Sequence, residues 1–279
     1  TMTCCQIDLV KLLKNGFSTG HGHLREPNDI ESYAALACIA IQSDQNDQHG
    51  GQSVPNFDYS MAPGVKKSYR KLYYTNLGKL LEGLCDAEDG TETAKKICEE
   101  IEDETGLYPT MADSGAYRQK EAERLSGFGT PEQIEKIQTL SVRFADKEIR
   151  RKTYQAMEAL IHNLNTMHSR AGAQVPFSSL NYGTDTSPEG RLVMECIMEA
   201  TEAGLGNGET PIFPIQIFKV KEGVNYNPED PNYDLFQLAC RVSAKRLFPN
   251  FSFLDAPFNL QYYREGHPET ECAYMGCRT

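Results

Sequence analysis

Residues 174–189 read QVPFSSLNYGTDTSPE, and this stretch decides the fold class more clearly than any other. Its first nine residues are short on charge, contain aromatic and β-branched side chains and end before a glycine, which is typical of a strand. A helix start follows at once, because a hydroxyl residue precedes Pro188 and because Thr186 and Glu189 have the spacing of a capping box. A strand that leads directly into a helix predicts one unit of an α/β fold.

The same alternation extends outward over most of the chain. Apolar residues recur at three- and four-residue spacing over residues 151–168, which predicts an amphipathic helix. Further helices are predicted from Pro188 to Gly204 and over residues 233–247. Because strands that alternate with helices pair in parallel, the sequence predicts an α/β fold with helices outside a parallel sheet. The five predicted strands are residues 4–9, 174–182, 212–220, 250–254 and 273–276.

Residues 66–150 interrupt this rhythm with charged helical sequence and are interpreted as an insertion within one domain, residues 1–279. Nine acidic and two basic residues lie between residues 86 and 104, which is typical of a solvated surface. A basic helix comes just before them. It could hold a nucleotide phosphate or simply be solvated; its basic residues are Lys66, Lys67, Arg70, Lys71 and Lys79.

Composition excludes several classes of protein. The 279 residues carry a formal charge of −11, which disfavours binding to duplex nucleic acid. The longest apolar run, residues 34–41, is too short to span a membrane, and the first residues do not resemble a secretory signal. Nine cysteines without a C-x-x-C pair argue against a disulfide framework or structural zinc and favour a reducing, cytoplasmic setting.

Two cysteines are candidates for chemistry. Cys277 follows a glycine at the end of a strand-like segment, where its sulfur would be presented at the tip of a turn. Near the other end of the chain, period-two alternation separates Cys4, Gln6 and Asp8 from an apolar set that begins with Cys5. The polar set should point away from the covering helices, so Cys4 rather than Cys5 is predicted to face an internal site.

Two other motifs carry weaker signals. Gly50, Gly51 and Ser53 form a loop that could bring backbone N–H groups to an anion, although it matches neither the phosphate-loop nor the dinucleotide-binding pattern. His162 and His168 are six residues apart on a predicted helix, so they lie on different faces and do not form a metal site.

Residues 162–184, HNLNTMHSRAGAQVPFSSLNYGT, resemble a pattern of the anaerobic, class III ribonucleoside-triphosphate reductases, in which a helix leads into an inner barrel strand. Three further stretches agree with that family in the same order: residues 3–9 (TCCQIDL), 230–234 (DPNYD) and 275–279 (MGCRT).

The resemblance implies a glycyl-radical enzyme built on a ten-stranded α/β barrel, of which this chain would supply the first five-stranded parallel half. It implies that Cys277, on a finger loop, becomes a thiyl radical and that Cys4 is its partner thiol. The activity implied is reduction of ribonucleoside triphosphates to deoxyribonucleotides for DNA synthesis, with formate as the reductant.

The resemblance also implies partners and ligands. These are a radical-SAM activase, a second subunit in a homodimer, and ATP or dNTP effectors, for which Gly50, Gly51, Ser53, Lys67 and Lys71 are the matching candidate contacts. The glycyl radical and a zinc site would belong to a C-terminal segment that does not occur in this sequence, and no metal ligands are expected within it. We therefore expect this to be an internal piece of a reductase that shows no turnover in isolation.

Two alternatives remain at this stage. The chain could be a non-catalytic remnant that binds nucleotide or a partner without reducing the nucleotide. A relative of pyruvate formate-lyase is disfavoured, because that family has adjacent cysteines on the finger loop and this sequence has Gly276 and Arg278 on either side of Cys277.

Overall fold

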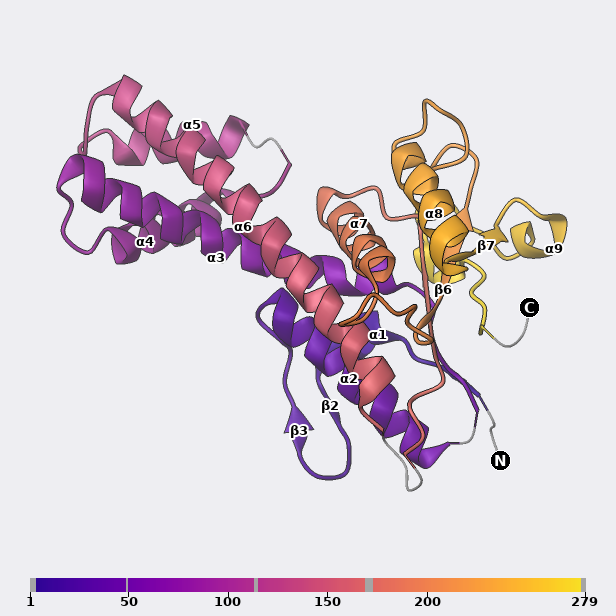
Figure 1. The fold of residues 1–279 in the computed structure, drawn as a ribbon. Helices are drawn as coiled ribbons and strands as arrows, with labels where there is room; N and C mark the ends of the chain where they lie inside the picture. Colours follow the sequence, from indigo (N-terminus) through magenta and orange to yellow (C-terminus); the bar gives the residue numbers. More distant parts are fainter. Residues whose placement is uncertain (1–3, 49, 113–114, 169–172, 277–279) are drawn as a thin grey trace. The chain divides into compact units, whose positions relative to one another are not determined.

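The computed structural model describes residues 4–48, 50–112, 115–168 and 173–276 (Figure 1). The chain divides into two compact units, one formed by Thr1–Gly64 with Thr153–Thr279 and the other by Val65–Lys152. Two long helices, α3 (Phe57–Cys85) and α6 (Pro131–Thr166), contribute residues to both units.

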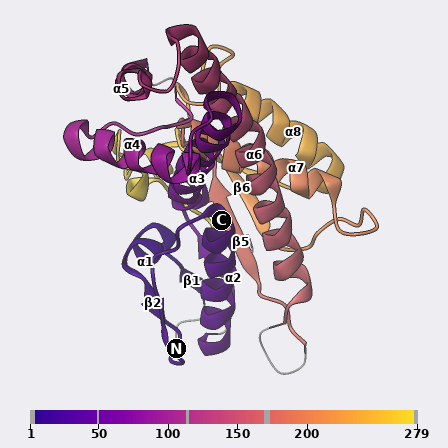
Figure 2. The ribbon, with the colours of Figure 1, turned by 90° about the vertical axis from the view of Figure 1, so that its left-hand side faces the viewer.

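The first unit is built on a five-stranded sheet in which every neighbouring pair is parallel. The strand order is β1-β4-β5-β6-β7, which follows the order along the chain. Figure 2 shows β5 and β6 side by side. The predicted α/β fold with a parallel sheet is therefore confirmed. The strands are β1 (Cys5–Gln6), β4 (Gln52–Val54), β5 (Ser178–Tyr182), β6 (Ile215–Val220) and β7 (Asn250–Phe253).

The two faces of this sheet differ in chemistry, because successive side chains of a strand point to opposite faces. We call one the helical face; there Gln216 donates to Thr201 of α7, and the ring of Phe218 stacks on Phe236 of α8. We call the other the polar face; its side chains include Gln6, Ser53, Ser179, Asn181 and Lys219. The remaining elements of this unit are α1 (Leu9–Asn15), a hairpin of β2 (Phe17–Ser18) and β3 (His23–Leu24), α2 (Ile30–Asp47), α7 (Pro188–Ala203), α8 (Tyr233–Arg246), α9 (Pro257–Leu260) and the 3₁₀ turn Pro268–Thr270.

Helix α7 begins at Pro188, where the sequence predicts, but its cap differs from the prediction. The Ser187 hydroxyl, and not that of Thr186, accepts the hydrogen bond from the backbone N–H of Gly190 at 3.1 Å. The proline occupies the first turn, where its missing N–H would have no helical partner in any case. The helix ends before Gly204, as predicted.

The second unit contains α4 (Gly90–Thr105) and α5 (Gly115–Leu125) with parts of α3 and α6, and the predicted insertion, residues 66–150, lies within it. A buried carboxylate, Glu121, joins its helices. It accepts hydrogen bonds from the hydroxyls of Tyr73 and Tyr117 and from the amide of Gln138, at 2.7–2.9 Å. Burial raises the pKa of Glu121, and these three donors oppose the rise.

Some strand predictions were wrong. Strand β4 was interpreted as a loop, because its Gln52 and Ser53 are polar although both are buried. Residues 273–276 are not a strand of the sheet, and the first strand ends before Leu9, which is the first residue of α1. Contacts with distant residues decide the conformation of β4 and of residues 273–276 more than local composition does, whereas the first strand ends because Asp8 caps α1.

Candidate functional site

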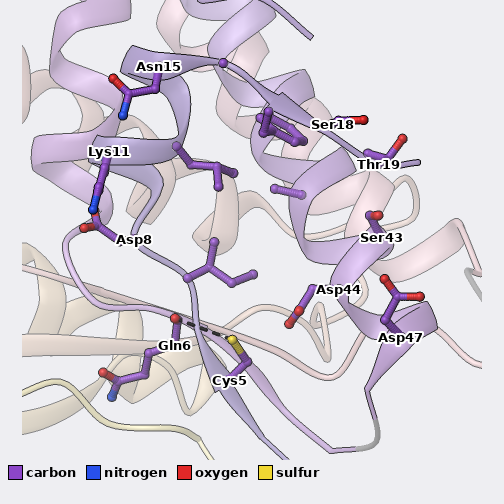
Figure 3. Close-up of a pocket in the computed structure, with 15 residues that line it drawn as sticks. Cys5, Gln6, Asp8, Lys11, Asn15, Ser18, Thr19, Ser43, Asp44 and Asp47 are labelled. Atoms are coloured by element: carbon purple, nitrogen blue, oxygen red, sulfur yellow. Dashed lines mark hydrogen bonds between the residues drawn. The ribbon is translucent and has the colours of Figure 1, made fainter. Parts of the chain in front are cut away.

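The site is built on the polar face of the sheet, beginning at β1. The Gln6 amide reaches across this face to the carbonyl of Ala273 at 3.1 Å. Cys5 faces the opposite side, where its thiol lies near Asp44 of α2 (Figure 3). Cys4 lies just before β1, and its predicted orientation toward the same face as Gln6 stays a prediction from strand alternation. Asp8 departs from the expected pattern, because it caps α1 by accepting a hydrogen bond from the backbone N–H of Lys11.

Residues 268–276, which we call the crossing segment, run over the polar face and are bound to it mainly through their backbone. The Ser53 hydroxyl donates to the carbonyl of Tyr274 at 2.9 Å. The Asn181 amide donates to the same carbonyl and accepts from the Tyr274 N–H, both at 2.9 Å. The Ser179 hydroxyl accepts from the N–H of Gly276, also at 2.9 Å. Together with Gln6 of β1, these side chains of β4 and β5 hold the last described residues before Cys277.

Gly276 permits the closest approach of this segment to the sheet. A Cβ at this position would lie 2.5 Å from two carbon atoms of the Ile215 side chain on β6, well inside van der Waals contact. The sequence singled out this glycine for its backbone freedom, and the structure shows that the lack of a side chain is what allows the contact. Cys277 itself lies outside the described residues.

A buried ion pair holds the start of the crossing segment. The ammonium of Lys219 lies 2.7 Å from Glu271 and 2.6 Å from the side-chain oxygen of Asn56, and the Lys219 side chain is 0% exposed. The Thr184 hydroxyl donates to the same carboxylate oxygen of Glu271 at 2.8 Å. Burial raises the pKa of Glu271, and the charge of Lys219 opposes the rise. Asn56 completes the anchor by donating to the carbonyl of Pro268.

Two more buried acids meet at the carboxyl end of the sheet, Asp58 in the first turn of α3 and Asp185 in the loop after β5. Asp58 accepts hydrogen bonds from the backbone N–H groups of Gly183, Thr184 and Asp185 at 2.9–3.2 Å. Burial and the nearby charge of Asp58 together raise the pKa of Asp185 to about 6. Asp58 is therefore held by backbone donors, whereas the raised pKa of Asp185 favours its protonated form.

A cavity of about 800 Å³ lies between the crossing segment and the β6–β7 side of the polar face. Ile217 and Phe251 contribute apolar lining, and Tyr274 and Met275 line it from the crossing segment. The Ser252 hydroxyl on this wall has no hydrogen-bond partner within the described part of the chain. This is a half-open, mostly apolar cavity that could accept a small organic ligand, and it adjoins Gly276.

A second cavity, of about 510 Å³, lies at β1, α1, β2 and α2. Figure 3 shows Cys5 at its base with Asp44 pointing toward it. Burial and the charge of Asp44 raise the pKa of the Cys5 thiol, which keeps it protonated and a weak nucleophile.

The other predicted contacts lie in separate places. Gly50 is exposed and Gly51 is buried, with its carbonyl accepting from the N–H of Cys5 at 3.1 Å. The Ser53 hydroxyl is engaged by Tyr274 and Asn181, as described above. Lys67 and Lys71 lie one turn apart on α3 in the second unit, where Lys71 is exposed. In the same stretch, Arg70 pairs with Glu102 and Lys66 lies 5.0 Å from the centre of the Tyr108 ring.

The residues that anchor the crossing segment were missed by sequence reasoning. Asn181 lies 93 residues from Tyr274, and Lys219 lies 52 residues from Glu271. The sequence nevertheless contained a clue to them. Asn181 and Lys219 occur within predicted strands, and polar side chains of this kind are costly to bury without specific partners.

The described residues contain neither a cluster of metal ligands nor a helix that could span a membrane. In residues 4–48, 50–112, 115–168 and 173–276, no three His, Cys, Asp or Glu side chains are grouped as metal ligands would be. Within the same ranges, no helix combines the length and the apolar character needed to cross a bilayer.

Comparison with known proteins gives consistent results. A family model described as anaerobic ribonucleoside-triphosphate reductase matches residues 1–279. The anaerobic ribonucleoside-triphosphate reductase of Enterobacteria phage T4 is 28% identical over 277 residues, covering 99% of this chain and 35% of the phage protein. The protein of the same name from Escherichia coli (strain K12) is 27% identical over 248 residues, covering 88% of this chain and 27% of the bacterial protein. The chain therefore spans about a third or less of the length of these relatives.

Proposed function

Because the chain belongs to the anaerobic ribonucleoside-triphosphate reductase family, we propose that it forms part of the catalytic domain of such a reductase, with Cys277 and Cys4 as the reacting thiols. One observation carries the proposal. The crossing segment is hydrogen-bonded along its backbone to the polar face and leads directly into Cys277. We infer from strand alternation that Cys4, just before β1, faces the same side.

The proposed reaction needs two thiols on opposite sides of a ribose. A sulfur radical on Cys277 would take the hydrogen atom from C3′ of a ribonucleoside triphosphate and return it at the end of the cycle. Cys4 would give its proton to the departing 2′ hydroxyl, regain a proton from the 3′ hydroxyl as that group becomes a ketone, and then give a hydrogen atom to C2′. Formate would return a hydrogen atom to the resulting sulfur radical of Cys4, and the CO₂ radical anion left behind would reduce the 3′ ketone by one electron with uptake of H⁺. With formate as the reductant, the net reaction balances as NTP + HCOO⁻ + H⁺ → dNTP + CO₂ + H₂O. The radical itself would come from a part of the polypeptide outside residues 1–279, generated by a radical-SAM activase.

We further propose that the five-stranded sheet is one half of a ten-stranded barrel whose interior is lined by the polar face. The difference between the two faces of the sheet supports this proposal. Helices cover one face, while the other buries Ser53, Asn181 and Lys219 against the crossing segment. An interior of this kind would exclude water from a radical reaction.

The nucleotide contacts belong to the same proposal. Gly50, Gly51, Lys67 and Lys71 are proposed contacts for nucleotide phosphates, either of the substrate or of ATP and dNTP effectors in a homodimer. For Ser53 the geometry favours support of the crossing segment instead, because its hydroxyl already donates to the Tyr274 carbonyl. A reducing cytoplasm would keep the two reacting thiols free.

The test uses the longest open reading frame that contains residues 1–279, purified without oxygen together with its activase. We expect Cys277→Ser to abolish both dNTP formation and release of tritium from 3′-tritiated NTP. Cys4→Ser should abolish dNTP formation only. Cys5→Ser is the matched control, because its thiol faces α2, and it should retain activity.

Full activity in Cys277→Ser would overturn the proposal. An inactive Cys5→Ser together with a fully active Cys4→Ser would overturn it as well. Nucleotide binding without reduction in the wild-type protein would instead support a non-catalytic remnant.

A further inference from the structure

Asn181 presents an unusual contact for a strand residue in the centre of a sheet. Its side chain is 0% exposed, and its amide pairs with both backbone groups of Tyr274, which lies three residues before Cys277. The same amide nitrogen lies 3.1 Å from the Ser53 hydroxyl and 3.2 Å from the carbonyl of Val54. The side-chain amide of Asn181 therefore bonds to Tyr274 as the backbone of a neighbouring strand would, with one donor and one acceptor.

This pairing specifies the register of the crossing segment. The N–H and C=O groups of successive residues in an extended chain point in opposite directions, so a slip of one residue would leave the buried amide of Asn181 without partners. Apolar packing alone would tolerate such a slip, because dispersion contacts have little directional preference. The Ser179 bond to Gly276 adds a second fixed point nearer Cys277.

We propose that Asn181 is a positioning residue for Cys277, holding the crossing segment in the one register that directs this sulfur toward the substrate. The inference rests on the proposed function, in which Cys277 must approach one ribose hydrogen. A displacement of about 1 Å in such an arrangement lowers a rate by about 100-fold. Asn181 would therefore affect the rate of the chemical step more than the binding of the nucleotide.

The first variant is Asn181→Asp in the longer polypeptide with its activase. At neutral pH the carboxylate would have no proton to donate to the Tyr274 carbonyl, and we expect kcat for dNTP formation to fall about 100-fold with KM for the nucleotide unchanged. At low pH the protonated acid regains an O–H donor in the same place. The ratio of variant to wild-type kcat should therefore rise as the pH falls.

The matched control is Gln216→Glu. Gln216 is an equally buried amide on the neighbouring strand, but it bonds to Tyr182 and Thr201 on the helical face and does not touch the crossing segment. If Asn181 only supported the fold, both variants would lower kcat to the same extent. That result, or an Asn181→Asp enzyme with wild-type kcat at neutral pH, would overturn the inference.

A second measurement separates this inference from the proposed reaction. In the 279-residue chain, amide hydrogen exchange at Tyr274 and Gly276 should accelerate by at least about 10-fold in Asn181→Asp and remain unchanged in Gln216→Glu. Unchanged exchange would contradict the positioning role of Asn181 even if the longer enzyme is active. Accelerated exchange in a protein that makes no dNTP would support the contact between Asn181 and the crossing segment but would reject the proposed function.

Discussion

At the scale of single residues, Asp185 shows how burial changes an ordinary side chain. It lies at the carboxyl end of β5, where burial and the neighbouring Asp58 disfavour its charged form and raise its pKa to about 6 from 3.8. The folded state therefore binds its proton more tightly than the unfolded state does. The resulting stabilisation is complete below pH 3.8 and is lost as the pH rises to about 6.

We predict that Asp185→Asn removes this pH dependence. Relative to the variant, the wild-type free energy of unfolding should fall by about 3 kcal/mol between pH 4 and pH 7, as measured by urea titration at each pH. Glu222→Gln, at an exposed acid, serves as the control and should keep the wild-type slope. An Asp185→Asn protein with the wild-type slope would show that another group titrates.

At the scale of elements, contact between α3 and α4 depends on two glycines. A Cβ at Gly78 would lie 2.3 Å from the Cα of Thr91 and 2.5 Å from its backbone nitrogen, and a Cβ at Gly90 would lie 2.3 Å from the carbonyl oxygen of Gly78. Both neighbours are backbone atoms, so no side chain can rotate to make room. Helix α3 contains another glycine, Gly83, with no atom within 4 Å of such a Cβ.

Gly78 and Gly83 of α3 should therefore respond oppositely to alanine. Gly78→Ala forces α3 and α4 apart and is expected to lower the free energy of unfolding by about 1–3 kcal/mol. Gly83→Ala is expected to raise it by up to about 1 kcal/mol, because alanine favours a helix over glycine without meeting an obstacle. Chemical denaturation followed by circular dichroism measures both. Equal effects of one sign would show that the close approach does not determine stability.

At the scale of the whole molecule, β1 and β7 are the edge strands of the parallel sheet in the described part of the chain. The β7 edge is also apolar. Phe253 is 55% exposed, Phe258 of α9 is 66% exposed, and Tyr262 after α9 is 63% exposed. An uncovered strand edge beside exposed aromatic rings favours association.

We predict that the 279-residue chain self-associates through this edge and that Phe258→Lys shifts it toward the monomer. Sedimentation velocity over a range of concentrations measures the effect. Tyr226→Lys removes an aromatic side chain of similar exposure from the loop after β6, which is not an edge strand, and should leave association unchanged. A wild-type chain that sediments as a monomer at every concentration would contradict the prediction.

Much of the local structure could be predicted, because it depends on residues close together in the chain. The start of α7 at Pro188 follows from a hydroxyl residue and a proline, although the choice of Ser187 over Thr186 depended on backbone geometry. The period of a strand predicts opposite orientations for Cys4 and Cys5, and Cys5 indeed lies toward α2. Strand β4 could not be found in this way, because Gln52 and Ser53 are buried only through partners that are distant in sequence.

The sequence by itself determined the α/β class, the order of most strands and helices, and the family, since these depend on local periodicity, capping and collinear motifs. Only the tertiary structure decided that residues 273–276 cross the polar face instead of joining the sheet. It also identified Asn181, Lys219 and Glu271 as the side chains that hold that segment. The physical reason is that buried polar groups are stable only with specific partners, and those partners lie 93 and 52 residues away along the chain.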